Sequence, residues 1–111
     1  MNLSFGDGTG QGVAAGMYGL GDKFAALAAA GVLVVAAAGN NYATTPGIAY
    51  PAADPNVLPV GAVFAADRGA AVWAGGAKDY TSGPDRIASF SQRDAAGVTL
   101  FAPGVFVPTT G

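Results

Sequence analysis

The chain has 111 residues and contains no cysteine, no histidine and no glutamate. The absence of cysteine excludes disulfides, thiolate metal sites and cysteine nucleophiles. The absence of histidine excludes a histidine-ligated metal. Because histidine is the usual general base near neutral pH, these residues also cannot form a complete Ser-His-Asp relay by themselves.

Charged residues are few as well, at 11% of the chain, and the net charge is −2. The five basic residues are scattered along the sequence: Lys23, Arg68, Lys78, Arg86 and Arg93. Without a basic cluster, we expect no nucleic-acid partner and no anionic-membrane partner. No signal-peptide pattern opens the chain, and the longest apolar run, residues 25–38, is interrupted by Gly31 and too short to span a bilayer.

What is present indicates a packed domain or part of one. Hydrophobic residues make up 51% of the chain, and 18 residues are glycine. Strand-like apolar segments stand directly at both ends, so we expect a piece of a larger domain. The Ala- and Gly-rich, Asp-only composition is typical of exported bacterial enzymes, so we expect the full-length protein to be secreted or part of the cell envelope.

The first half of the sequence has the pattern strand, helix, strand. A short strand is expected at residues 2–5, ended by the Gly-rich segment 6–10. A helix is expected over residues 13–30, with Gly31 as its C-terminal cap. Its buried face would carry apolar residues spaced four and three apart: Val13, Met17, Leu20, Phe24 and Leu27.

Two further apolar runs predict strands of a parallel sheet. Residues 32–37 are continuously apolar, as in a strand covered on both faces, and residues 57–63 form a second such run after a Pro-rich loop at 39–55. This order predicts an α/β fold with a parallel sheet. Beyond these runs we expect an irregular hairpin at 65–85, order at 87–91 and 98–101, a turn at 102–104 and order at 105–107.

Candidate site residues follow two of these strands. Ligands of open α/β sheets bind at the carboxyl ends of the strands, where Ser4–Phe5–Gly6 and Ala37–Ala38–Gly39–Asn40 should lie on the same rim. The amide of Asn40 could donate a hydrogen bond to a developing negative charge without titrating near pH 7. The alternative is that Asn40 only serves a turn, since Gly-Asn pairs are common turn formers.

Four segments together resemble the subtilisin-like serine proteases. They are GVLVVAAAGNN at 31–41, YPAADPNVLPVGAV at 50–63, IASFSQR at 87–93 and LFAPG at 100–104. The opening NLSFG also resembles the family's strand with a Ser-Leu-Gly type tip. The resemblance implies part of a three-layer, parallel-sheet subtilisin-like fold over residues 1–111, with 65–85 as an irregular insertion.

The resemblance also implies roles for individual residues. Asn40 would be the oxyanion-hole amide. Ser4, Phe5 and Gly6 would form one wall of a peptide-binding cleft, and the opposite wall would be formed by Ala37, Ala38 and Gly39.

Two further features resemble the family at residues 50–57. Tyr50-Pro51 resembles a dipeptide that is cis in the family, against the alternative of an ordinary trans proline. Carbonyls near Ala52, Asp54 and Val57 resemble a weak site for a structural calcium or sodium ion, against the alternative of a plain solvated loop. No other cofactor is implied.

The catalytic Asp, His and Ser would lie before Met1 and after Gly111. The expected partners are therefore a polypeptide substrate and the rest of the protease domain, and we predict that the chain alone does not hydrolyse peptides. A non-enzymatic peptide-binding module is the alternative. A nucleotide-binding domain is disfavoured, because no complete phosphate-binding glycine pattern links a strand to a helix.

Overall fold

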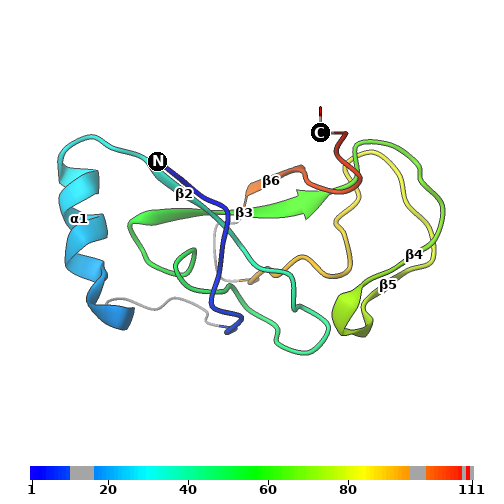
Figure 1. The fold of residues 1–111 in the computed structure, drawn as a ribbon, viewed down its shortest axis with the longest axis horizontal. Helices are drawn as coiled ribbons and strands as arrows, with labels where there is room; N and C mark the ends of the chain where they lie inside the picture. Colours follow the sequence, from blue (N-terminus) through cyan, green and yellow to red (C-terminus); the bar gives the residue numbers. More distant parts are fainter. Residues whose placement is uncertain (11–16, 96–99, 109, 111) are drawn as a thin grey trace.

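The computed structural model describes residues 1–10, 17–95, 100–108 and 110, and contains one mixed α/β unit. Its central feature is a four-stranded, all-parallel sheet in the order β1-β2-β3-β6 (Figure 1). The strands are β1 Asn2–Leu3, β2 Val34–Ala37, β3 Val57–Val63 and β6 Leu100–Pro103. The predicted α/β class with a parallel sheet is confirmed.

Helix α1, Gly21–Ala29, connects β1 to β2 and is shorter than predicted. Of the expected span 13–30, residues 11–16 lie outside the described part, and Met17–Gly19 is a 3₁₀ turn in which Tyr18 has a φ of 56°. The prediction was wrong for 17–20, where Gly19 weakens helix propensity.

The C-terminal cap of α1 is as predicted. Gly31 has a φ of 76°, its N–H donates to the Ala28 carbonyl, and the Val32 N–H donates to the Leu27 carbonyl. This is a Schellman motif, which needs the left-handed conformation that glycine adopts without a steric cost. It ends the helix and turns the chain toward β2.

The two faces of the sheet are covered unequally. Val34 and Ala36 on β2 are buried, whereas Val35 between them is half-buried, and β3 alternates in the same way. Side chains of a strand point alternately to opposite faces. The expectation that β2 is covered on both faces is therefore met on one face only among the described residues.

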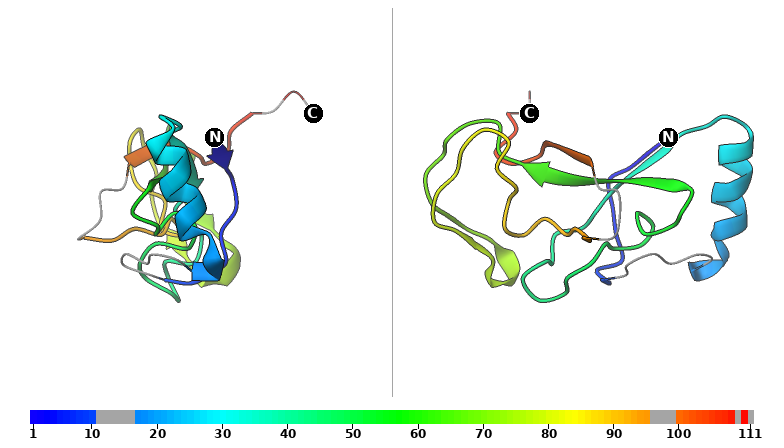
Figure 2. Two further views of the ribbon diagram at one scale, coloured as in Figure 1. Left: turned by 90° about the vertical axis from the view of Figure 1, so that its left-hand side faces the viewer. Right: turned by 180° about the vertical axis from the view of Figure 1, so that it is seen from behind.

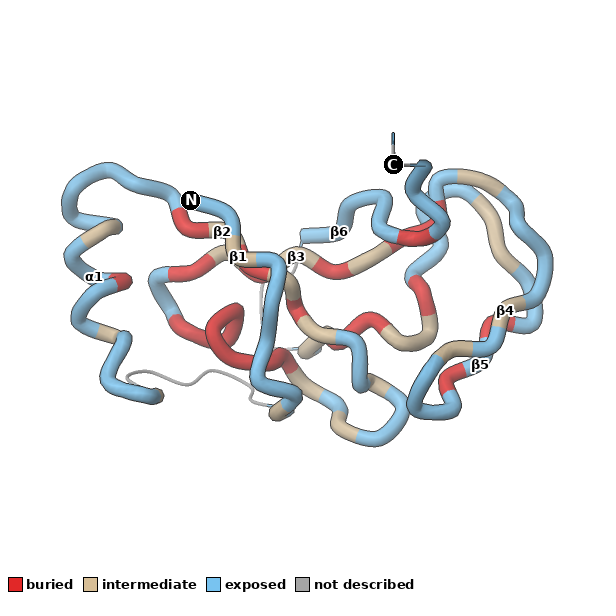
Figure 3. The backbone as a smooth tube through the Cα atoms, viewed as in Figure 1, coloured by how far each residue is buried: buried red, intermediate tan, exposed pale blue. Residues whose placement is uncertain are grey.

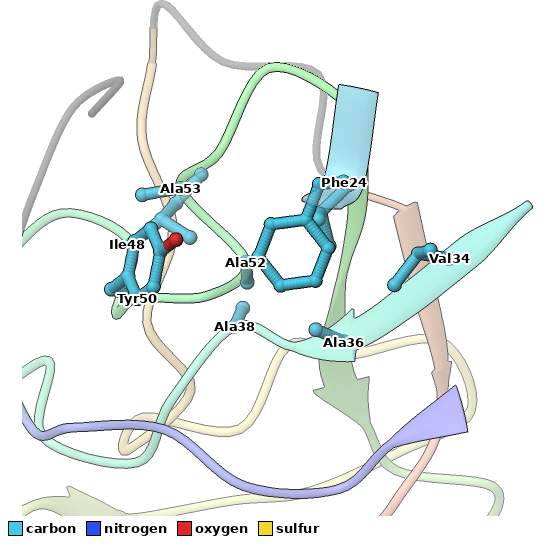
Figure 4. Close-up of a cluster of buried hydrophobic side chains, with 9 residues drawn as sticks. Phe24, Val34, Ala36, Ala38, Ile48, Tyr50, Ala52 and Ala53 are labelled. Atoms are coloured by element: carbon cyan, nitrogen blue, oxygen red, sulfur yellow. The ribbon is translucent and has the colours of Figure 1, made fainter. Parts of the chain in front are cut away.

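The covered face holds the main core (Figure 4). Phe24 of α1 packs there against the buried face of β2 and the turn that carries Tyr50, and the rings of Phe24 and Tyr50 are 6.3 Å apart. Figure 3 shows the buried residues concentrated along β2, β3 and the 48–54 segment. The cluster consists of Phe24, Val34, Ala36, Ala38, Ile48, Tyr50, Ala52, Ala53 and Val57.

Residues 65–85 form the irregular hairpin that was expected there. Strands β4 Ala71–Val72 and β5 Lys78–Asp79 pair antiparallel around a 3₁₀ turn at Ala74–Gly76. The hairpin lies at the end of the sheet opposite to α1 (Figures 1 and 2). That it is an insertion relative to the family stays a prediction.

A second core anchors this hairpin. Trp73 packs edge-on against Phe90 at 4.8 Å and also contacts Phe64. The carboxylate of Asp79 is buried and accepts hydrogen bonds from the Trp73 indole N–H at 2.7 Å and from the Ser89 hydroxyl at 2.9 Å. A buried carboxylate is tolerated because these donors satisfy it.

The C-terminal segment differs from the prediction at its turn. Strand β6 continues through Ala102 and Pro103, so the predicted turn at 102–104 is wrong for its first two residues. Residues 98 and 99 lie outside the described part, and residues 105–107 form no strand, with Phe106 at a φ of 50°. No helix in the described ranges is long and apolar enough to cross a membrane.

Candidate active site

A cavity of about 210 Å³ opens at the carboxyl ends of β1 and β2. We call it the strand-tip cavity. It brings together six of the predicted site residues: Ser4, Phe5, Gly6, Ala37, Gly39 and Asn40. Four further residues complete its lining: Gly8, Asn41, Ala49 and Gln92. The two strand tips therefore meet on one rim, as the parallel sheet requires.

One wall of the cavity has a free backbone. Ser4, Phe5 and Gly6 follow β1 and make no hydrogen bond to another backbone group in the described part of the chain. A Cβ at Gly6 would lie 3.2 Å from the Ala49 Cβ, so this wall packs closely on the segment before Tyr50. Unpaired amides and carbonyls at a strand edge can pair with an added extended peptide.

Asn40 stands on the rim of the opposite wall. It is exposed, and its side-chain amide makes no hydrogen bond to any described residue. Both N–H donors of that amide are therefore available to a ligand in the cavity. Because an amide does not titrate, this donor capacity does not depend on pH near neutrality.

Two features require glycine at position 39, directly before Asn40. The φ of Gly39, 111°, lies in a region that L side chains rarely adopt, and a Cβ there would overlap the side chain of Gln92. The Gly39 carbonyl accepts a hydrogen bond of 2.9 Å from the Gln92 backbone N–H. The position of Asn40 thus depends on Gln92, which lies in the IASFSQR segment and for which the sequence predicted no role.

Ala38 does not line the strand-tip cavity. Its side chain is buried in the main core, its N–H donates to the Val60 carbonyl, and its carbonyl accepts from the Ala49 N–H. Ala38 directly follows Ala37, the last residue of β2, and continues its pairing with β3, so the two side chains point to opposite faces. Of the predicted second wall, Ala37 and Gly39 line the strand-tip cavity, and Ala38 lines the larger hollow that adjoins it.

Asp7 fastens the first wall to Tyr50. The Asp7 N–H donates to the Tyr50 carbonyl at 2.9 Å, the Tyr50 N–H donates to Asp7 Oδ1 at 3.1 Å, and the Tyr18 hydroxyl donates to Asp7 Oδ2 at 2.9 Å. The slight desolvation of the exposed Asp7 carboxylate alone would raise its pKa, but the hydrogen bonds from Thr9, Tyr18 and Tyr50 outweigh it and lower the pKa.

The Tyr50-Pro51 peptide bond is cis. This is the isomer that the family resemblance implied. Tyr50 itself is buried, and burial, together with the carboxylates of Asp54 and Asp7, raises the pKa of its hydroxyl. Tyr50 therefore stays neutral at physiological pH as part of the core.

Of the expected cation site, Ala52 and Asp54 lie in the turn after Pro51 and Val57 begins β3, and all three are buried. The Asp54 carbonyl accepts from the Val57 N–H at 3.0 Å, and Asp54 Oδ1 accepts from the Asn56 N–H at 2.9 Å. No group of three or more acidic, histidine or cysteine side chains suited to a metal occurs within residues 1–10, 17–95, 100–108 and 110. A cation held by Ala52, Asp54 and Val57 stays a prediction.

A larger hollow, of about 440 Å³, adjoins the strand-tip cavity on the less covered face of the sheet. We call it the face cavity. The two cavities share Ser4, Ala37, Gly39 and Asn40. The face cavity is otherwise lined by small residues of the sheet such as Val35, Val60, Ala62 and Ala102. This apolar face would suit a further packed layer.

These features are those of a parallel α/β domain with a cavity at its strand tips. Comparison with known families identifies which domain it is: the model of the Subtilase family matches residues 1–110. The chain belongs to the subtilase family, a family of serine peptidases. A search of curated proteins found no match.

Proposed function

We propose that this chain supplies the oxyanion-binding and substrate-cleft part of a subtilisin-like serine endopeptidase. The observation that carries the proposal is the position of Asn40. Its amide is exposed and unpaired within the described residues, and it stands at the rim of the strand-tip cavity opposite the free backbone of Ser4, Phe5 and Gly6.

The chemistry is acyl transfer. When a nucleophile attacks the scissile carbonyl carbon, the π electron pair of the C=O bond moves onto oxygen, and an alkoxide develops. A fixed N–H donor at that oxygen stabilises the transition state more than the ground state. Asn40 is suited to this role because its amide is not consumed by an internal hydrogen bond.

The nucleophile and base are not supplied by these residues. The chain has no histidine. The serines of the SFS segment are occupied, since the Ser91 hydroxyl accepts from the Ala62 N–H at 2.8 Å and the Ser89 hydroxyl donates to Asp79. Ser91 is also buried. We therefore assign the triad residues to segments outside this chain.

A peptide-binding module without catalysis is the second candidate. The chain without histidine favours it, as does the unpaired backbone wall, which can hold an extended peptide by strand addition. In both candidate functions a peptide binds at the strand-tip cavity. They differ in whether a nucleophile and a base reach that peptide.

Hydrolysis of a chromogenic peptide tests the proposal, with the purified chain alone and mixed with separately made flanking segments that carry the triad. Activity only in the mixture supports the protease. Saturable peptide binding with no hydrolysis in either sample supports the binding module. Turnover by the chain alone contradicts the assignment of the triad to other segments.

A further inference from the structure

Gln92 is a fully buried polar side chain in the wall of the strand-tip cavity. Buried glutamine is uncommon, because the carboxamide must find partners for its two donors and its acceptor. Gln92 lies in the SFSQR segment, which contributes no strand to the parallel sheet. Its function in the cavity wall follows from the groups that its side chain contacts.

The two donors of Gln92 join the two loops that form the cavity. Nε2 donates to the Thr9 carbonyl at 2.8 Å and to the Thr45 carbonyl at 2.9 Å. Thr9 belongs to the loop after β1, and Thr45 belongs to the loop after β2. A single side chain thus links the segment that follows the Ser4–Gly6 wall to the segment that follows Asn40.

The rest of Gln92 fixes the peptide before Asn40. Its backbone N–H donates to the Gly39 carbonyl at 2.9 Å, and its Oε1 fills the space in which a Cβ at Gly39 would lie. The side-chain amide of Gln92 is therefore placed so that Nε2 reaches the Thr9 and Thr45 carbonyls and Oε1 contacts Gly39. Oε1 itself is buried and accepts no hydrogen bond from the described residues.

We infer that Gln92 is a positioning residue that sets the direction of the Asn40 amide and the width of the cleft. It acts through Gly39 on one side and through Thr9 and Thr45 on the other, and it does not touch the reacting atoms. The inference rests on the proposed function, because the amide it positions is the proposed oxyanion donor. Small displacements of such a donor lower the rate constant without removing the donor.

A double-mutant cycle in the full-length protein tests the inference. Gln92→Met keeps the length of the side chain but removes both donors. We expect it to lower kcat by about 10- to 100-fold, with a smaller change in KM. In the background of Asn40→Ala we expect the same substitution to lower kcat much less, because the donor that it would misplace is already gone.

Activity is expressed per active site titrated with an irreversible inhibitor, so that unfolded protein does not count. Gln92→Glu serves as a second variant, since it keeps the shape beside Gly39 while its ionised carboxylate loses both donors to the Thr9 and Thr45 carbonyls. Trp73→Phe is the matched control. It removes a buried hydrogen bond in the second core, to Asp79, and should leave kcat unchanged.

The outcomes distinguish failure of the proposed function from failure of the positioning role of Gln92. If Asn40→Ala leaves kcat unchanged, or the full-length protein is inactive, the proposed function fails and the inference fails with it. If Asn40→Ala lowers kcat but the Gln92 variants lower it by the same factor in both backgrounds, or not at all, the function stands and the positioning role is overturned. A loss that largely disappears in the Asn40→Ala background supports both.

Discussion

Asp7 and Tyr50, 43 residues apart in the sequence, are joined by two hydrogen bonds in opposite directions, one between backbone groups and one to the Asp7 carboxylate. The Asp7 N–H donates to the Tyr50 carbonyl at 2.9 Å, and Asp7 Oδ1 accepts from the Tyr50 N–H at 3.1 Å. This pair ties the wall after β1 to the cis Tyr50-Pro51 peptide bond. The two hydrogen bonds therefore fix the position of the cleft wall relative to the main core.

The first prediction concerns the pH dependence of this pair. The pKa of Asp7 is lowered in the folded chain, so the ionised form stabilises the fold above the unfolded pKa of about 3.9, and this contribution is lost as the pH falls through the lower folded pKa. Asp7→Asn should lower stability by about 1 kcal/mol at pH 7, a modest value because the residue is solvent-exposed.

Thermal unfolding of both proteins from pH 7 down to pH 2.5 measures this. We expect the difference in Tm to shrink as the pH drops below about 4. A difference that stays constant or grows toward low pH would show that the carboxylate charge does not contribute.

The second prediction concerns Gly39. Gly39→Ala combines an unfavourable φ with an overlap on Gln92, so it should destabilise the chain by more than about 2 kcal/mol. Gly31→Ala is the matched control. Gly31 also has a positive φ, but a Cβ there meets nothing within 4 Å, so the cost should be about 1–2 kcal/mol.

Urea unfolding measures the loss in free energy of unfolding for each variant. The additional loss expected for Gly39→Ala reports the contact with Gln92. Equal losses for the two glycines would mean that only the backbone conformation matters at Gly39.

The third prediction concerns Phe24, the one residue of α1 that is buried. Phe24→Ala should cost about 3–5 kcal/mol, because the ring fills the space between β2 and Tyr50 in the main core. Leu20→Ala, at an exposed position just before the helix, should cost well under half of that. Far-UV circular dichroism during urea unfolding measures both, and similar losses would contradict the placement of α1.

The fourth prediction concerns the hairpin at 65–85. Trp73→Phe removes the indole N–H that donates to Asp79, which should cost about 1–2 kcal/mol and make the hairpin easier to cleave. Tyr80→Phe is the control, since this side chain is 82% exposed. Limited proteolysis with mass spectrometry locates the cuts. Equal cleavage rates in the two variants would mean that Asp79 does not anchor the hairpin.

Much of the fold could be predicted from the sequence because local patterns and tertiary packing agree. The strand at 57–63 has the predicted bounds, since a continuous apolar run in a parallel sheet has few alternatives. The helix was extended too far, because the apolar spacing continued through Met17 and Leu20 while the glycines there favoured a turn. The prediction gave more weight to the apolar spacing than to the low helix propensity of glycine, whereas the structure follows the propensity.

The candidate site divides in the same way. Asn40 and Gly39 could be found because they end a recognisable strand. The side chain of Ala38 could have been assigned to the core from the two-residue period of a strand, in which it faces away from Ala37. The role of Gln92 could not be predicted, because its partners Thr9 and Thr45 are 83 and 47 residues away and form no sequence motif with it.

The central claim is that Asn40 donates to the developing oxyanion, and the most direct test is the kcat of the full-length protein with Asn40→Ala. In another subtilase the loss of one such donor lowered kcat by about 10²- to 10³-fold, and we predict a loss of that order here. The control Asn56→Ala, the same truncation at an exposed residue that lines neither cavity, should change kcat little. Unchanged kcat in the Asn40→Ala protein, or an equal loss in both variants, would contradict the account.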